Sequence, residues 1–424
     1  MERSGSVRKR VLKAGDATEK AEETPEDVGN VPVVKKKKTW ADLSTRLLAA
    51  AVMIGTVIAT IWTGHIAVST LVVFMECIVY SEVVNLGYLK AQESGMPWFK
   101  RVTWGFFAST QYFVYGKSVL GHFEAQGRKF METALLKFLL RHHTFVSFTV
   151  YCGFFVAFVL SLQPKLASYQ FGIYARSHIA IFVVITCANF MILNVKMGMI
   201  WFFLPVVCVA MNDSFSYIFG RMFGKTPLTA LSPKKTWEGL IYGGITTLIS
   251  GFFVSRLLSH WEFMTCPKPE FTDCNILCRA HCTPSTVFLP YMVSLPKVFG
   301  GVTFSLAPIQ LHGVVIALFT SVLAPFGGFF ASGAKRAFKV KDFGSIIPGH
   351  GGITDRVDCH LVMAVFTYVY VINFVRDRAP DVEKLLIMVT ELTLAEQEEL
   401  FDELYQIILN KGANVTALLT EVVQ

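Results

Sequence analysis

Long apolar runs alternate with short polar connections along most of this chain. A helix that crosses the hydrocarbon core of a bilayer needs roughly 20 mostly apolar residues. About nine segments approach that length, which predicts an all-α protein, a polytopic transmembrane helix bundle. The expected spans are Leu47–Trp62, Ile66–Leu86, Trp104–Leu120, Phe145–Leu162, His178–Leu193, Met199–Phe219, Gly239–Leu258, Leu311–Phe330 and Leu361–Phe374.

Both ends of the chain lack this apolar pattern. Residues 1–45 are highly charged and contain no apolar stretch of the kind that a secretory signal needs, which predicts a disordered cytosolic arm. Residues 376–424 form a polar, acidic tail. Within the tail, Thr393–Glu396 has the form of a capping box, apolar residues recur at helical spacing, and Gly412 suits a helix stop. We therefore expect one short amphipathic helix in the tail.

The composition agrees with a membrane protein. Of 424 residues, 53% are hydrophobic and only 17% are charged, a balance that excludes an ordinary soluble domain. Between the two polar ends we expect N-terminal transmembrane helices over residues 46–219. A catalytic transmembrane domain is expected over residues 220–375, because the loops there carry most of the candidate chemistry.

The positive charges predict an orientation. Lys35–Lys38 precedes the first span, and such a run either marks the cytosolic side or binds anionic lipid headgroups. From a cytosolic N-terminus, nine spans place the Lys- and Arg-containing loops 220–238 and 331–360 in the cytosol. The loop 259–310 and the tail are then lumenal, where Asn414 becomes a glycosylation acceptor.

Four cysteines cluster in the loop that we expect to be lumenal. In an oxidising lumen disulfides are favoured over a zinc site with His281, and the sequence leaves their pairing open. These residues are Cys266, Cys274, Cys278 and Cys282.

The segment Lys341–Asp358 gathers charges and glycines between two apolar runs. A charged residue costs roughly 2.5–3.5 kcal/mol at the centre of a membrane helix, so these must meet water, protein or a polyanionic ligand. Asp355 and Asp358 share one helical face if a helix begins near Thr354, an arrangement suited to Mg²⁺. The glycines before them and the helix N-terminus favour a phosphate, so the pattern indicates a nucleotide polyphosphate site. A polar turn whose charges pair with one another is the alternative.

The other cytosolic loop has a similar character. Asp213 lies near the cytosolic end of the sixth span, and Arg221 follows it. Lys234 and Lys235 then precede a new helix, whose N-cap we expect to be Ser232 or Thr236. This is a second helix start at which a phosphate is favoured.

Two motifs in these loops resemble a known family. "SPKKTWEG" (Ser232–Gly239) and "SGAKRAFKVKDFGSIIPGHGGITDRVD" (Ser332–Asp358) are similar to the signature of the phosphatidate cytidylyltransferases, also called CDP-diacylglycerol synthases, in their eukaryotic branch. The resemblance implies that CTP and phosphatidic acid give CDP-diacylglycerol and pyrophosphate. Bacterial members carry an acidic residue where this chain has Gly328, so one metal carboxylate is missing, and Asp213 or Asp342 is expected to substitute.

The resemblance also implies roles for individual residues. Mg²⁺ and a second metal ion are expected at Asp355, Asp358, Asp342 and Asp213. His350 is expected to donate a hydrogen bond or a proton to the departing pyrophosphate. The remaining groups are expected to bind phosphates and substrate: Lys234, Lys235, Lys335, Arg336, Lys341, Arg356, Arg221, Ser232, Thr236, Gly351 and Gly352.

The expected partners are CTP, phosphatidic acid and the lipid bilayer of the endoplasmic reticulum, with the site facing the cytosol and no nucleic acid. A homo-oligomeric state is left open. Two rival functions are a CTP-dependent polyprenol or dolichol kinase and a membrane transporter. Glu76, well inside the second span, is either a functional acid or the partner of a cation on another helix.

Overall fold

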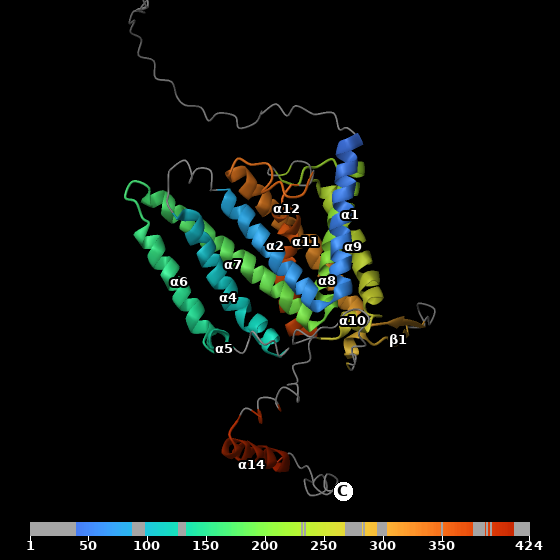
Figure 1. Ribbon diagram of the computed structural model, residues 1–424. Coiled ribbons are helices and arrows are strands. Elements are labelled where there is room, and N and C mark those ends of the chain that lie inside the picture. The colour runs from blue at the N-terminus through green and yellow to red at the C-terminus, as the bar shows by residue number, and fades with distance from the viewer. Residues whose placement is uncertain are drawn as a thin grey trace, which may run out of the picture. The chain divides into compact units, whose positions relative to one another are not determined.

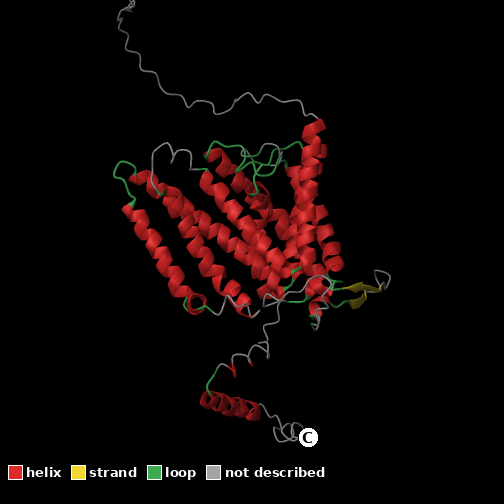
Figure 2. Ribbon diagram, in the orientation of Figure 1, coloured by secondary structure: helices red, strands yellow, loops and turns green. Residues whose placement is uncertain are grey.

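The computed structural model describes residues 40–86, 98–125, 133–229, 232, 235–267, 282, 285–294, 303–348, 351–375, 386, 389–390 and 392–410. Most of these residues are helical, as Figure 2 shows, which confirms the predicted all-α class. The long helices are α1 (Trp40–Thr63), α2 (His65–Asn85), α4 (Phe99–Ala125), α6 (His143–Leu160), α7 (Ala167–Met197), α8 (Met199–Phe223), α9 (Trp237–Leu258), α11 (Pro308–Ala337), α12 (Thr354–Tyr370) and α14 (Leu394–Asn410). Shorter ones are α5 (Ala134–Arg141), α10 (Glu262–Thr265), the 3-10 helix η2 (Thr286–Phe288) and the π-helix η4 (Val371–Val375).

Seven helices in the described part of the chain are long and apolar enough to cross a membrane. They are α2, α6, α7, α8, α9, α11 and α12 extended by η4. The two other expected spans, Leu47–Trp62 and Trp104–Leu120, lie within α1 and α4. α4 is less apolar because Lys100, Arg101 and Lys117 interrupt it. The protein is therefore a multi-pass membrane protein, and the count of nine spans stays a prediction.

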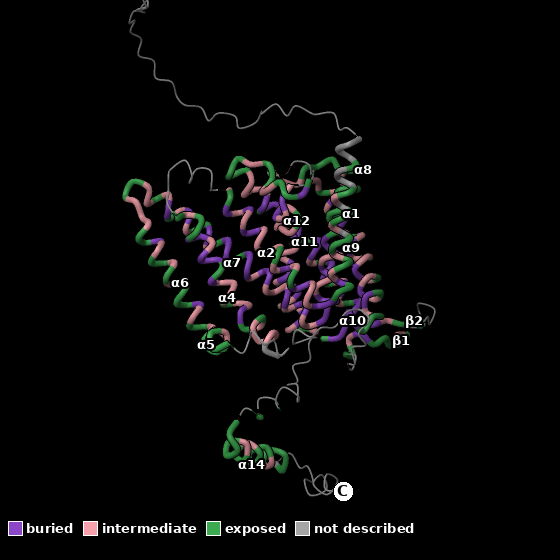
Figure 3. The backbone as a smooth tube through the Cα atoms, in the orientation of Figure 1, coloured by how far each residue is buried: buried purple, intermediate pink, exposed green. Residues whose placement is uncertain are grey.

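The helices that are long and apolar enough to cross a membrane run side by side together with α4, with α6 and α4 at one side and α8 and α9 at the other (Figure 1). α2 packs on α7 and α4 packs on α6, while α12 contacts both α7 and α11. Three apolar cores result among the described residues: a large one around Leu204 and Ile316, one around Tyr80 and Phe106, and a small one around Ile192. Figure 3 shows that burial is concentrated between the helices, whereas much of α6 is exposed. In a bilayer such exposed apolar surface faces lipid.

Small residues bring α8, α9 and α11 close together. A Cβ atom at Gly243 of α9 would lie 2.7 Å from the backbone nitrogen of Ser216 in α8. One at Gly251 of α9 would lie 2.6 Å from the Cβ of Ala317 in α11. Close approach of this kind is how helices pack in membranes, where no hydrophobic force drives them together.

The predicted helix starts are confirmed at three places. Thr236 caps α9 by accepting the Gly239 N–H at 3.2 Å, and α12 begins at Thr354. In the tail, the backbone N–H and the hydroxyl of Thr393 donate to one oxygen of Glu396 at 2.8 and 2.7 Å. These bonds lower the pKa of the Glu396 carboxyl, so it is ionised at neutral pH and the cap is retained. The expected stop at Gly412 lies outside the described residues.

The connection between α9 and α11 contains a small hairpin that the sequence analysis did not predict. β1 (Tyr291–Ser294) pairs antiparallel with β2 (Thr303–Leu306), and strands of four residues are too short to give a clear alternating pattern. A disulfide joins Cys266 and Cys282, which confirms the expectation of disulfides for these two residues. Cys274 and Cys278 lie outside the described residues.

Candidate active site

The helices that carry the two charged loops pack against one another. α8 and α9 flank the loop 224–236, and α11 and α12 flank the loop 338–353. α11 contacts α8, α9 and α12, and α12 also contacts α8. Segments that are far apart in the sequence are thereby brought to one place.

Two charged residues from different segments, Lys235 and Asp358, lie beside Gly328 of α11. A Cβ atom at Gly328 would lie 3.4 Å from Lys235 Nζ and 3.6 Å from Asp358 Oδ2, which is ordinary van der Waals contact. Asp213 of α8 interacts electrostatically with Lys235 and with Asp358. Asp358 Oδ1 accepts the Cys359 N–H at 2.7 Å. We call Asp213, Lys235 and Asp358 the acid–lysine cluster.

Asp355 is, by contrast, fully bonded within the protein. Its Oδ1 lies 2.6 Å from Lys335 Nζ, and its Oδ2 accepts the N–H groups of Phe343 at 3.0 Å and Gly352 at 3.1 Å. The side chain is 6% exposed. For Asp355 the structure therefore matches the alternative of charges that pair with one another. Its carboxylate joins the end of α11 to the start of α12.

The N-terminus of α12 is bonded to Glu82, near the end of α2. One oxygen of Glu82 accepts the Ile353 N–H at 3.0 Å, and the other accepts the N–H and the hydroxyl of Thr354 at 2.8 and 2.7 Å. Glu82 is 4% exposed. The position where the sequence pattern favours a phosphate thus holds a carboxylate of the protein itself.

The glycines of this loop fit that arrangement. Gly351 has a φ of 83°, in the left-handed region that favours glycine. A Cβ atom at Gly352 would lie 2.6 Å from Glu82 Oε2. Gly352 therefore allows Glu82 to approach the backbone closely, and binding of substrate by these two glycines stays a prediction.

The loop that presents Lys235 is closed by its own hydrogen bonds. The Leu228 N–H donates to the Lys235 carbonyl at 2.8 Å, and the Lys235 N–H donates to the Ser232 carbonyl at 3.0 Å. Glu238, in the first turn of α9, accepts the Thr226 N–H at 3.2 Å. Lys235 thus extends from a defined turn, with its Nζ 4.8 Å from the ring centroid of Phe329.

The other predicted site residues lie around this centre. Arg221 is exposed and donates to the hydroxyl of Tyr217 at 3.3 Å. Asp342 lies beside Gly351, where a Cβ atom would be 3.2 Å from its carboxyl carbon. Three further predicted site residues, Arg336, Lys341 and Arg356, are exposed. Lys234 and His350 lie outside the described residues.

No three His, Cys, Asp or Glu side chains gather closely enough to hold a metal ion in the part of the chain that the structure describes. Mg²⁺ commonly uses only one or two carboxylates and takes its other ligands from water and substrate phosphates. Asp213 and Asp358 fit that requirement. Asp355 fits it less well, because both of its oxygens already bond to Lys335 and to backbone N–H groups.

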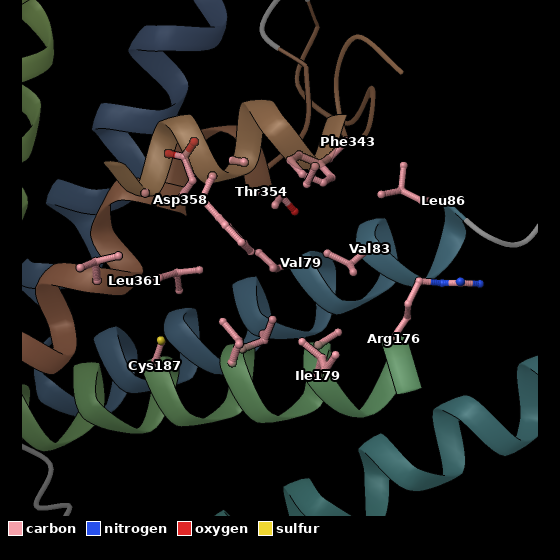
Figure 4. Close-up of a pocket in the computed structure, with 18 of the residues that line it drawn as sticks. Val79, Val83, Leu86, Arg176, Ile179, Cys187, Phe343, Thr354, Asp358 and Leu361 are labelled. Atoms are coloured by element: carbon pink, nitrogen blue, oxygen red, sulfur yellow. The ribbon is translucent and has the colours of Figure 1, made fainter. Parts of the chain in front are cut away.

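An apolar cavity of about 750 Å³ lies between α2, α4, α7, α11 and α12. Figure 4 shows Val79 and Val83 of α2 and Ile179 of α7 among its lining residues. Two polar residues of α12, Thr354 and Asp358, also line it. Its volume is in the range of small-ligand pockets, and its wall includes a member of the acid–lysine cluster.

Sequence reasoning missed Glu82, although the signal that selected Glu76 also applies to it, since both are acids within the second span. Glu76 accepts hydrogen bonds from Gln111 and Tyr115 of α4. These hydrogen-bond donors are neutral, so a cation partner, one of the two alternatives for Glu76, is not observed among the described residues.

Comparisons with known proteins show the family of this chain. The sequence profile described as the cytidylyltransferase family matches residues 44–374. The chain is 38% identical over 385 residues to phosphatidate cytidylyltransferase 1 of Arabidopsis thaliana, covering 89% of this chain and 90% of that protein. It is 36% identical over 400 residues to phosphatidate cytidylyltransferase 1 of Homo sapiens, covering 92% and 86% of the two chains. The chain therefore belongs to the cytidylyltransferase family.

Proposed function

We propose that this protein condenses CTP with phosphatidic acid to give CDP-diacylglycerol and pyrophosphate. The observation that carries this proposal is the position of Asp358, which belongs to the acid–lysine cluster and also lines the apolar cavity. A substrate with a phosphate head and two acyl chains needs both surroundings at one place. The names of the relatives support the same reaction.

The reaction requires little acid–base chemistry from the protein. A phosphate oxygen of phosphatidic acid, already anionic at neutral pH, attacks the α-phosphorus of CTP, and the bond to the β-phosphate oxygen breaks. The main tasks are to bring two polyanions together and to stabilise charge on the leaving pyrophosphate. Bound Mg²⁺ would supply part of that charge stabilisation.

The protein's own groups divide these tasks. Asp213 and Asp358 would hold the metal, with Asp342 as a further candidate. Lys235 would bind a phosphate beside them. Asp355 would act by holding Lys335, whose Nζ also lies 5.6 Å from the ring centroid of Phe343. The other phosphate-binding and pyrophosphate-binding roles expected from the sequence remain part of the proposal.

The acyl chains would occupy the cavity between α2, α4, α7, α11 and α12. It is lined mainly by apolar side chains, and the phosphate would lie beside Asp358, which also lines it. Phosphatidic acid could then keep its chains at membrane depth while its head meets the charged loops. This arrangement explains why a nucleotide-using enzyme is built from membrane helices.

We place this site on the cytosolic face of the endoplasmic reticulum membrane. The basic residues of both catalytic loops support a cytosolic position under the positive-inside rule. The disulfide Cys266–Cys282 lies in the loop at the opposite ends of α9 and α11, which suits an oxidising lumen.

One assay separates the proposed reaction from its rivals. Purified protein in detergent is incubated with Mg²⁺, each of the four nucleoside triphosphates, and either phosphatidic acid or a polyprenol. We expect CDP-diacylglycerol only with CTP and phosphatidic acid, and no product once EDTA removes the metal. A phosphorylated polyprenol would identify a kinase instead, and the absence of any product with protein shown to be folded would favour a transporter.

A further inference from the structure

Glu82 lies far along the chain from both catalytic loops and is absent from the mechanism above. Its carboxylate is buried and accepts three hydrogen bonds, from the N–H groups of Ile353 and Thr354 and from the Thr354 hydroxyl. These are the first groups of α12. A buried carboxylate with three donors is held in one geometry, because breaking any bond leaves a polar group unsatisfied.

The first turn of α12 depends on this carboxylate. A helix leaves its first four N–H groups without partners inside the helix, and a side chain just before the helix usually accepts one of them. The residue in that position is Ile353, which makes no capping side-chain bond. Glu82 supplies the cap from another helix, and its negative charge is favourable at the positive end of the helix dipole.

Three consecutive N–H groups are divided between two acids. The Gly352 N–H donates to Asp355, whereas those of Ile353 and Thr354 donate to Glu82. The same turn continues to Asp358 of the acid–lysine cluster. A shift of Glu82 would therefore rotate the turn that carries both Asp355 and Asp358.

Glu82 also connects that turn to the apolar cavity. Val79 and Val83 of α2 line the cavity, as Figure 4 shows, and Glu82 is the residue before Val83. α2 thus contributes to the cavity wall and to the start of α12 through neighbouring residues. Movement of this wall would be transmitted to the carboxylates by hydrogen bonds.

We propose that Glu82 is a positioning residue, which fixes the first turn of α12 so that Asp355 holds Lys335 and Asp358 faces Lys235. The expected effect of Glu82 on enzymatic turnover rests on the proposed function. Its expected effect on the first turn of α12 does not depend on that function. A merely structural role would lower the stability of the whole protein without changing the metal requirement of the folded enzyme.

The test uses the full-length protein carrying Glu82→Gln, which keeps the shape but removes the charge and replaces one acceptor by a donor. The matched control is Glu76→Gln, a second buried acid of α2 whose partners lie on α4. Hydrogen exchange of the peptide 343–358, measured without substrate, reports on the turn. The kcat, the KM for CTP and the half-saturating Mg²⁺ concentration report on the site.

For Glu82→Gln we expect exchange at Ile353 and Thr354 to be at least 10-fold faster, kcat to fall at least 10-fold, and the half-saturating Mg²⁺ concentration to rise at least 3-fold. The control should keep wild-type exchange in this peptide and a wild-type Mg²⁺ requirement. Unchanged exchange in Glu82→Gln would overturn the proposal. So would a variant that loses stability while its folded fraction keeps the wild-type Mg²⁺ requirement.

If Glu82→Gln does not fold, a second pair of variants tests the same proposal. Thr354→Val removes one of the three donors and should change exchange and the Mg²⁺ requirement in the same direction, whereas Thr354→Ser should restore both. Failure of Thr354→Ser to restore them would contradict the positioning role. If the wild-type protein made no CDP-diacylglycerol, the proposed function would fail, and the exchange measurement would still decide the role of Glu82.

Discussion

At the residue scale, the two acids of the α12 signature have different surroundings. Asp358 accepts the N–H of Cys359, the next residue, and lies with Lys235 beside Gly328. Asp355 bonds to Lys335 and to two backbone N–H groups. Residues that match one motif therefore need not share one role, and their substitution should have separable effects.

Asp358→Asn is expected to lower kcat at least 100-fold with little change in melting temperature. The amide oxygen can still accept the Cys359 N–H, but the charge that a metal ion needs is lost. Steady-state kinetics at saturating Mg²⁺ and a thermal melt of the purified variant measure both quantities. Near-normal turnover would exclude Asp358 as a metal ligand.

Asp355→Asn should instead lower both turnover and stability. Lys335 loses its partner, and an amide cannot accept every bond that the carboxylate accepts, so we expect a loss of about 1–3 kcal/mol in the free energy of unfolding. Denaturation in detergent, compared directly with Asp358→Asn, measures the difference. Equal stabilities for the two variants would contradict the bonding pattern described for Asp355.

Lys235→Ala should mainly raise the KM for CTP, because a cation that positions a phosphate can be partly replaced by a higher concentration of nucleotide. The control is Lys165→Ala, which removes the same charge from an exposed position outside the site. Initial rates over a range of CTP concentrations compare the two. An unchanged KM in Lys235→Ala would remove Lys235 from the nucleotide site.

At the element scale, the contact of α9 with α11 depends on the absence of a side chain at Gly251. A Cβ atom there would meet Ala317 Cβ at 2.6 Å and the Gly313 carbonyl oxygen at 2.9 Å, so the helices would have to separate. This contact helps to bring the two charged loops together.

Gly251→Val is therefore expected to destabilise the protein by about 1–3 kcal/mol through overpacking. Gly153→Ala in α6 is the control, since a Cβ atom there would meet nothing within 4 Å. Thermal melts of both variants in one detergent give the comparison. A Gly251→Val protein as stable as the control would show that α9 and α11 separate at little cost.

Local features of these elements could be read from the sequence, and distant contacts could not. The caps at Thr236 and Thr393 and the start of α12 at Thr354 depend on neighbouring residues, which leave a pattern in the chain. Glu82 accepts hydrogen bonds from residues 271 and 272 positions away, and no local sequence pattern predicts such a contact. The spacing of Asp355 and Asp358 predicted a shared turn, but not that the oxygens of Asp355 were already bonded. The cavity depends on how five helices pack.

At the scale of the whole molecule, nine spans from a cytosolic N-terminus would place the tail in the lumen. A protease added to sealed microsomes should then remove an N-terminal epitope and spare one placed after Gln424. Detergent, which opens the vesicles, is the control and should make both epitopes sensitive. Digestion of the C-terminal epitope without detergent would show that the span count is wrong, most simply because the ninth span re-enters the membrane.

The hydrogen bonds between Glu82 of α2 and the start of α12 can form only late in biosynthesis. Ile353 is made 271 residues after Glu82, which at 5–20 residues per second is a delay of about 14–54 s. Throughout that interval the Glu82 carboxylate lacks the three donors that it has in the finished protein. A chain truncated before Ile353 would never acquire them, so its second helix would carry, near its end, a carboxylate without its helix-capping role.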